Sequence, residues 1–91
     1  MKFKTSTGKI VTGKRLQRAL QAVAEDWRAS ALAVHRNNMY PPHVTRSQKR
    51  RLLIDELKRA QRISDMTEPV GFWLWQRVNQ KLTGKCVAFL P

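Results

Sequence analysis

One long amphipathic stretch decides the fold: LQRALQAVAEDWRASALAV, which runs from Leu16 to Val34. Its apolar side chains recur at every third or fourth position, which is the spacing of one face of an α-helix. The positions of that face are Leu16, Leu20, Val23, Trp27, Ala31 and Val34. Thr12 is placed to cap the beginning of the helix, and Asn37 followed by the prolines at 41 and 42 favours its end. The pattern therefore predicts a helix over residues 13–36.

A second helix is predicted after this one. Thr45 and Gln48 match the capping box, in which two side chains and two backbone N–H groups at a helix start bond reciprocally. An apolar stripe follows at helical spacing and is made of Leu53, Leu57, Ala60 and Ile63. We expect this helix to end near Ser64.

The stretch GFWLWQRVNQKLTGK, from Gly71 to Lys85, predicts a third helix. Thr67 is a candidate cap with Pro69 near the first turn, and Gly84 suits the left-handed position after the last turn. On a helical wheel one side should join the core, and it consists of Phe72, Trp75, Val78 and Leu82. Trp73 and Leu74 point away from that side. They either pack against another part of this small domain or form a surface that binds a partner.

The predicted fold class is therefore mainly α, a compact three-helix domain over residues 1–91. A chain of 91 residues is the size of one domain. The two ends suit other structures. Residues 2–11 suit a short β hairpin, and Cys86 to Leu90 suit a short strand or an extended tail packed on the helices.

The charge balance points to a partner that is itself charged. Eighteen Lys and Arg side chains stand against six Asp and Glu, which gives a net charge of +12. Self-repulsion at this level opposes a compact fold, so such a charge usually has a polyanionic partner. Nucleic acid is the leading candidate, and an acidic protein or an anionic membrane surface comes next.

The positions of the cations favour phosphate binding. The first two predicted helices open with Lys and Arg, although the dipole at a helix start disfavours cations and attracts anions. The third differs, with Asp65 and Glu68 near its expected start. On the second helix a basic row faces away from the apolar stripe, and Asp55 within it can pair with Arg51 or Arg59. The predicted phosphate-binding residues are Lys14, Arg15, Arg18, Arg46, Lys49, Arg50, Arg51, Lys58 and Arg62.

Two smaller sets of residues suit more specific contacts. On the third helix Gln76, Arg77, Gln80 and Lys81 are side chains that can hydrogen-bond to base edges. Large, partly apolar side chains that could anchor a protein partner are Trp73, Leu74 and Tyr40. Polar residues are also ordinary on an outer helix face, so this pattern is less specific than the basic row.

Catalysis, cofactors and metals find little support. Residues 8–14 match half of a phosphate-binding P-loop, but Arg15 stands where the Ser or Thr that holds magnesium belongs. The acids Glu25–Asp26 and Asp55–Glu56 are sequence neighbours, so the two members of each pair diverge on their helix. We expect no enzyme activity, no cofactor and no metal site. One cysteine permits no internal disulfide and fits a reduced, cytoplasmic setting, and no segment suits secretion or a membrane span.

Two functions follow as hypotheses. The first is a non-enzymatic nucleic-acid-binding accessory protein, for which DNA and RNA both fit. The alternative is a small interaction module, an inhibitor or assembly factor, that docks on an acidic surface of a larger protein complex, for which a nucleic-acid-processing complex is one candidate. Peripheral membrane binding ranks third, because the bulky apolar residues of the basic helices are needed for the core.

Overall fold

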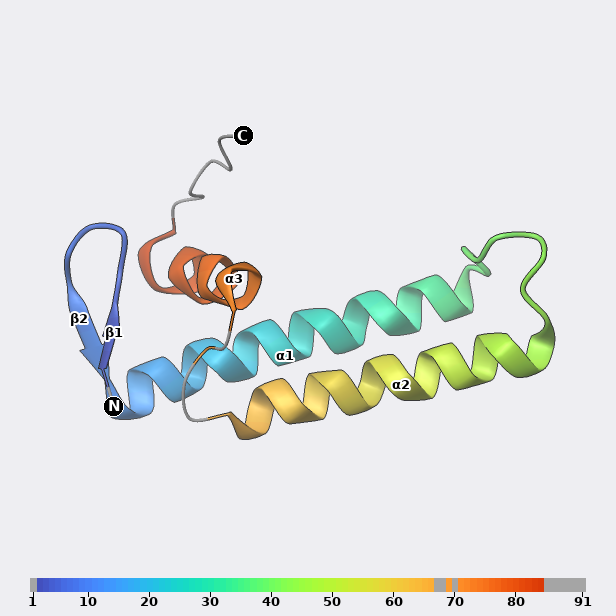
Figure 1. Cartoon of the computed structure of the whole chain (residues 1–91), viewed down its shortest axis with the longest axis horizontal. Helices are drawn as coiled ribbons and strands as arrows, with labels where there is room; N and C mark the ends of the chain where they lie inside the picture. Colours follow the sequence, from blue (N-terminus) through green and yellow to red (C-terminus); the bar gives the residue numbers. More distant parts are fainter. Residues whose placement is uncertain (1, 67–68, 70, 85–91) are drawn as a thin grey trace.

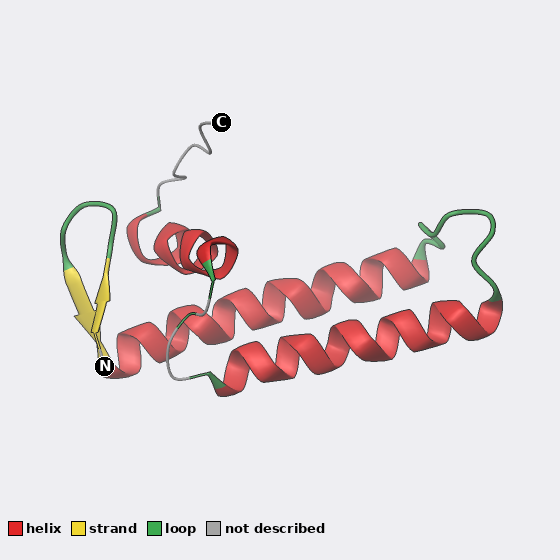
Figure 2. Cartoon of the chain, viewed as in Figure 1, coloured by secondary structure: helices red, strands yellow, loops and turns green. Residues whose placement is uncertain are grey.

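The computed structural model describes residues 2–66, 69 and 71–84 of the 91-residue chain. Figure 1 shows a β hairpin at one end, two long antiparallel helices, and a third helix packed beside the first of them. The elements are β1 (Lys2–Lys4), β2 (Ile10–Thr12), α1 (Gly13–Arg36), α2 (Arg46–Asp65) and α3 (Phe72–Thr83). Helix dominates, and the sheet has two strands (Figure 2). This confirms the predicted mainly α class with three helices and a short hairpin.

Helix α1 begins and ends at the predicted residues and carries the centre of the core. Its fully buried side chains are Leu16, Ala19, Leu20, Val23 and Ala24. The expectation that the Thr12 side chain caps the helix is wrong. Thr12 occupies the N-cap position, but it is also the last residue of β2, and its side chain makes no capping hydrogen bond. Gly13, with a φ of 61°, turns the chain from the strand into the helix.

Helix α2 begins with the predicted capping box. The Gln48 backbone N–H donates to Thr45 Oγ1 at 3.3 Å, and the Thr45 backbone N–H donates to Gln48 Oε1 at 2.9 Å. The helix ends at Asp65, one residue beyond the predicted end. Its apolar stripe faces α1, with Ala60 and Ile63 fully buried. The two helices thus form a long antiparallel hairpin (Figure 1).

Helix α3 starts later than predicted. Its N-cap is Gly71, with a φ of 90°, and Pro69 lies before the helix, not in its first turn. Thr67, the cap that the sequence predicted for this helix, lies outside the described residues. At the far end Gly84 adopts the left-handed conformation, with a φ of 72°, as predicted.

The core-facing side of α3 also differs from the prediction. Leu74 is 4% exposed and Val78 is fully buried, whereas Phe72 is 54% exposed. Leu74 and Val78 are one turn apart and both face the core, so Phe72, two residues or about 200° from Leu74, lies on the opposite side. Trp75 is partly buried and packs against the core, as predicted. Leu74 is therefore a core residue, and the expectation that it anchors a partner is wrong.

The β hairpin adds one apolar layer to the core. Phe3 and Val11 are paired across the two strands and are both buried, while Lys2 and Lys4 are exposed on the other face. The alternation is the one that a half-buried hairpin requires. The predicted extended tail, Cys86 to Leu90, lies outside the described residues.

A buried amide fixes the hairpin turn to α3. Asn79 is fully buried, and its Oδ1 accepts the Ser6 backbone N–H at 2.9 Å. The Asn79 amide in turn donates from Nδ2 to Ser6 Oγ at 3.0 Å. A buried amide that satisfies both of its polar ends in this way costs little to bury.

The capping box of α2 can be tested against the cap position of α1. Thr45→Ala removes the side-chain acceptor and should lower the free energy of unfolding by about 1 kcal/mol. Thr12→Ala, at a cap position with no side-chain bond, should change it by less than about 0.5 kcal/mol. Urea denaturation followed by circular dichroism measures both. Equal losses would contradict the assignment of the cap to Thr45.

The buried amide can be tested in the same way. Asn79→Ala leaves the Ser6 N–H without its acceptor and should cost about 1–2 kcal/mol of stability. Gln80→Ala is the neighbouring control on the exposed side of α3, and its effect should stay within about 0.5 kcal/mol. If the two variants unfold at the same urea concentration, the amide does not hold the hairpin.

Candidate functional site

The structure separates the predicted phosphate-binding residues into two groups. Because α1 and α2 run antiparallel, their N-terminal ends lie at opposite ends of a molecule 46 Å long (Figure 1). Lys14, Arg15 and Arg18 are exposed at the end that carries the β hairpin. At the other end a hollow beside the start of α2 is lined by His35, Arg46, Ser47 and Arg50. No single phosphate can contact both groups.

The contrast expected between the three helix starts is absent. None of the three has an acidic residue in its first turn. Asp65 is the last residue of α2, and Glu68 lies outside the described residues and before α3 begins. Both acids were expected at the start of α3 because the helix was predicted to begin earlier in the chain than it does. The absence of acids from the first turn therefore does not distinguish the basic starts of α1 and α2 from the start of α3.

The outer face of α2 keeps its row of cations. Arg51, Lys58 and Arg62 are all exposed, and 11 residues of helix place Arg51 about 16 Å from Arg62. The expected pairing of Asp55 with Arg51 or Arg59 is wrong. Among the described residues, Arg59 instead reaches Glu56, with Nη1 3.6 Å from Oε1. No described carboxylate lies within ion-pair distance of the three cations of the row.

Lys49 and Tyr40 belong to the connection between α1 and α2. Lys49 is half-buried; its Nζ donates to Asn38 Oδ1 at 2.6 Å and stands 5.9 Å from the centre of the Tyr40 ring. The Tyr40 hydroxyl is hydrogen-bonded to His35 Nδ1 at 3.1 Å. Lys49 is thus engaged inside the protein, unlike the other eight predicted phosphate ligands, which are exposed.

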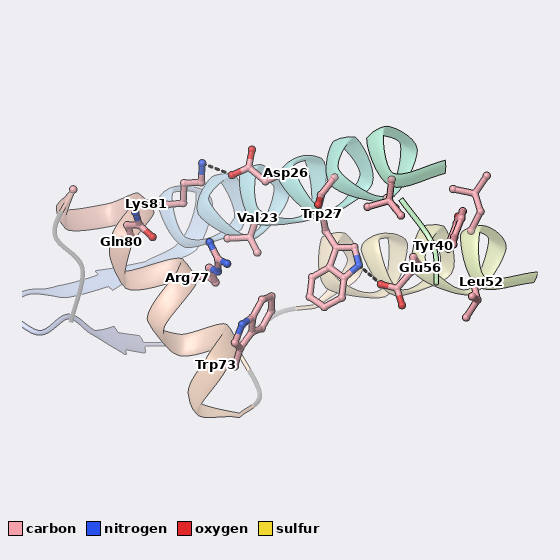
Figure 3. A pocket seen from close by; sticks show the side chains of 15 residues that line it. Val23, Asp26, Trp27, Tyr40, Leu52, Glu56, Trp73, Arg77, Gln80 and Lys81 are labelled. Carbon is pink, nitrogen blue, oxygen red and sulfur yellow. Dashed lines mark hydrogen bonds and ion pairs between the residues drawn. The ribbon is translucent and has the colours of Figure 1, made fainter. Parts of the chain in front are cut away.

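A groove of about 760 Å³ lies where α3 meets the α1–α2 hairpin. Figure 3 shows side chains from all three helices converging on it. Trp27 of α1 and Trp73 of α3 meet edge to face, with ring centroids 4.8 Å apart. The Trp27 indole Nε1–H donates to Glu56 Oε2 of α2 at 2.5 Å. We call this site the three-helix groove.

The three-helix groove collects most of the polar side chains predicted on α3. Arg77, Gln80 and Lys81 line it, whereas Gln76 is half-buried and does not. The Arg77 guanidinium stands over the Trp73 ring, 5.4 Å from its centre. Lys81 Nζ forms an ion pair with Asp26 Oδ2 of α1 at 2.6 Å, which a base contact by Lys81 would have to replace.

Two of the three predicted partner anchors also line the three-helix groove. Trp73 is 46% exposed and Tyr40 is half-buried, and they come from positions far apart in the sequence. Leu74, the third, lies in the core. The groove therefore contains residues from both smaller predicted sets, the base-contacting residues of the third helix and the anchors for a protein partner.

The sequence argument missed two contributors to this groove. Trp27 was assigned to the core stripe, and Glu56 was considered only as one member of the Asp55–Glu56 pair of acids. The sequence did indicate that Trp27 needs a hydrogen-bond acceptor, because a tryptophan assigned to the core has an indole N–H that is removed from water. The sequence does not indicate which residue is the acceptor, because Glu56 is 29 positions away and on a different helix. The exposed Lys2 and Lys4 were also missed, although their alternation with Phe3 is visible in the sequence.

Two kinds of site are absent from the part of the chain that the structure describes. Within residues 2–66, 69 and 71–84, no three His, Cys, Asp or Glu side chains gather closely enough to bind a metal ion. In the same residues, none of the helices combines the length and the apolar character needed to cross a bilayer.

The bond between Trp27 and Glu56 can be tested with a neighbouring acid as control. Glu56→Ala removes the indole acceptor and the partner of Arg59, and should lower the free energy of unfolding by about 1 kcal/mol, since Glu56 is partly exposed to water. Asp55→Ala changes the net charge equally but breaks no contact among the described residues, so it should have an effect below about 0.5 kcal/mol. Thermal and urea unfolding compare the two. A larger loss in Asp55→Ala would contradict this account of the groove.

Comparison with known proteins gives no relative from which a function could be transferred. No family model matches the chain, and neither curated proteins nor solved structures give a significant match. The function must therefore be argued from the residues and geometry of this chain.

Proposed function

We propose that the protein is a non-enzymatic nucleic-acid-binding accessory protein that holds the phosphate backbone with exposed cations. One observation carries the proposal. Among the described Lys and Arg residues, only Arg59 and Lys81 lie within ion-pair distance of a carboxylate. The remaining positive charge of a chain with a net charge of +12 is left for an external anion.

The outer face of α2 is the proposed main contact. Its row of Arg51, Lys58 and Arg62 extends over about 16 Å, which corresponds to about five base pairs of duplex at 3.4 Å each. Arg46 and Arg50 extend the positive surface towards the start of the helix. Lys49 is excluded from the proposed contact because Asn38 and Tyr40 engage it.

The end that carries the β hairpin is a second proposed contact. Lys14, Arg15 and Arg18 lie there at the start of α1, and Lys2 and Lys4 are exposed on the hairpin itself. Since the molecule is 46 Å long, one duplex would engage both ends only if it ran along the molecule for about 13 base pairs. A shorter oligonucleotide should engage one end at a time.

The proposal includes no catalysis. Two of the described acids, Asp26 and Glu56, are engaged by Lys81 and by Trp27 with Arg59. We place the protein in the cytoplasm because its one cysteine supplies no disulfide and because nucleic acid is the expected partner. Recognition of particular bases is not required, since phosphate contacts alone provide affinity.

The salt dependence of binding tests the proposal. Fluorescence anisotropy with a labelled duplex and a labelled single strand should give an affinity that falls steeply with salt. If six phosphates are neutralised, the slope of log K against log[salt] should be about −5 on duplex DNA. A flat salt response on both oligonucleotides would reject nucleic-acid binding.

A pair of charge-matched variants locates the contact. Lys58→Gln with Arg62→Gln removes two charges from the proposed face of α2 and should make the slope shallower by about 2. Arg28→Gln with Arg36→Gln removes two exposed charges from α1, outside the predicted set, and should leave the slope within about 0.5 of the original. Equal changes in the two double variants would show that net charge alone matters and that α2 is not the contact.

A further inference from the structure

We infer that the three-helix groove is a docking site for an acidic amphipathic helix of a partner protein. The inference goes beyond nucleic-acid binding and uses different residues, because the groove and the outer row of α2 share none. It rests on three properties of the groove: its size and apolar walls, its charge balance, and the way its aromatic pair is held.

The groove is apolar and open. Figure 1 shows α3 beside α1, and no other described helix or strand lies along the rest of α1 on that side. Apolar side chains from both long helices line the opening, including Ala31, Val34 and Leu52, and Leu52 is 43% exposed. A volume of about 760 Å³ suits several large side chains. A helix offers such a set at positions i, i+3 or i+4, and i+7 on one face.

The charge balance of the groove favours a carboxylate on the partner. The groove has two acids, and each is already matched: Asp26 pairs with Lys81, and Glu56 accepts from Trp27 and pairs with Arg59. Arg77 also lines the groove but has no carboxylate partner among the described residues; it stands over Trp73. The lining thus carries two acids and two cations, and Arg77 is the lining cation with no carboxylate within ion-pair distance among the described residues.

The aromatic wall is fixed before any partner binds. The Glu56 hydrogen bond holds the Trp27 indole, the edge-to-face contact holds Trp73 against it, and Arg77 covers part of Trp73 (Figure 3). Fixed Trp and Arg side chains at a partly exposed apolar site are the residue types that dominate binding energies in protein interfaces. Little side-chain freedom is left to lose on binding.

Two other occupants fit less well. Nucleic acid would bring phosphates next to the carboxylates of Asp26 and Glu56 in the groove walls. A second copy of this chain would bring another net charge of +12 to the same face. An acidic amphipathic helix differs from both, because it can place one carboxylate beside Arg77 and turn apolar side chains towards the rest of the groove.

A peptide selection on the full-length chain tests the inference. Random peptides of about 16 residues, long enough for four helical turns, are displayed on phage and selected with excess duplex DNA present to occupy the cationic surface. Enriched sequences should place bulky apolar residues at helical spacing with Asp or Glu beside them. In ¹⁵N spectra the best peptide should shift the indole signals of Trp27 and Trp73 more than that of Trp75, which does not line the groove.

Variants then test the two named contacts. Trp73→Ala should weaken binding of the selected peptide at least about tenfold, whereas Phe72→Ala, a neighbouring exposed aromatic outside the groove, should change it less than about twofold. Arg77→Gln should weaken the peptide about fivefold, and it should have no effect on the same peptide with its acid replaced by Gln. This double-variant cycle keeps the test valid if Trp73→Ala is unstable.

Several outcomes would overturn the inference. Failure to enrich any peptide, enrichment without acids, or equal binding to Trp73→Ala would each reject an acidic helix as the occupant. Shifts of the Trp27 and Trp73 indoles by an oligonucleotide would assign the groove to nucleic acid. Self-association that Trp73→Ala abolishes would assign it to a second copy, and peptide binding only after removal of residues 85–91 would assign it to this chain's own C-terminal segment. None of these outcomes alters the salt slope that tests nucleic-acid binding.

Discussion

The apolar stripe of α1 is the constraint on which the rest of the structure depends. The β hairpin, α2 and α3 all contact this one helix, and its buried residues Leu16, Leu20 and Val23 lie at the centre of the core. Most of the stability of a helix in a protein comes from the packing of its apolar face, so α1 depends on the core that it forms. The core is small, and it must hold the chain together against the mutual repulsion of a net charge of +12.

The cations of the protein fall into two groups. A few are drawn towards the protein and have local partners: Lys49 with Asn38, Arg59 with Glu56, Lys81 with Asp26, and Arg77 over Trp73. The other described cations have no carboxylate within ion-pair distance. The molecule consequently has a positive exterior and one mostly apolar groove, and the two are built from different residues.

The sequence predicted those parts of the fold that depend on local signals. The bounds of α1, the capping box of α2 and the left-handed Gly84 follow from side-chain spacing and backbone preferences within a few residues. The predicted start of α3 was wrong because the residue before the helix is Gly71 and not a polar residue of the kind that usually caps a helix. Phe72 and Leu74 were misassigned for a separate reason, since the packing of a helix against its neighbours decides which of its sides is buried. The groove was not predicted as a site, because Trp27, Glu56 and Trp73 come from three helices and no local pattern brings them together.

The bond between Ser6 and Asn79 has a consequence for the order of assembly. Its two residues are separated by 73 positions, so closing it orders most of the chain in one step and carries a large loop-closure entropy. Asn79 is synthesised after Ser6, so the hydrogen bond that holds the hairpin turn cannot form until α3 has been made. Before then the hairpin can pack against α1, which β2 contacts.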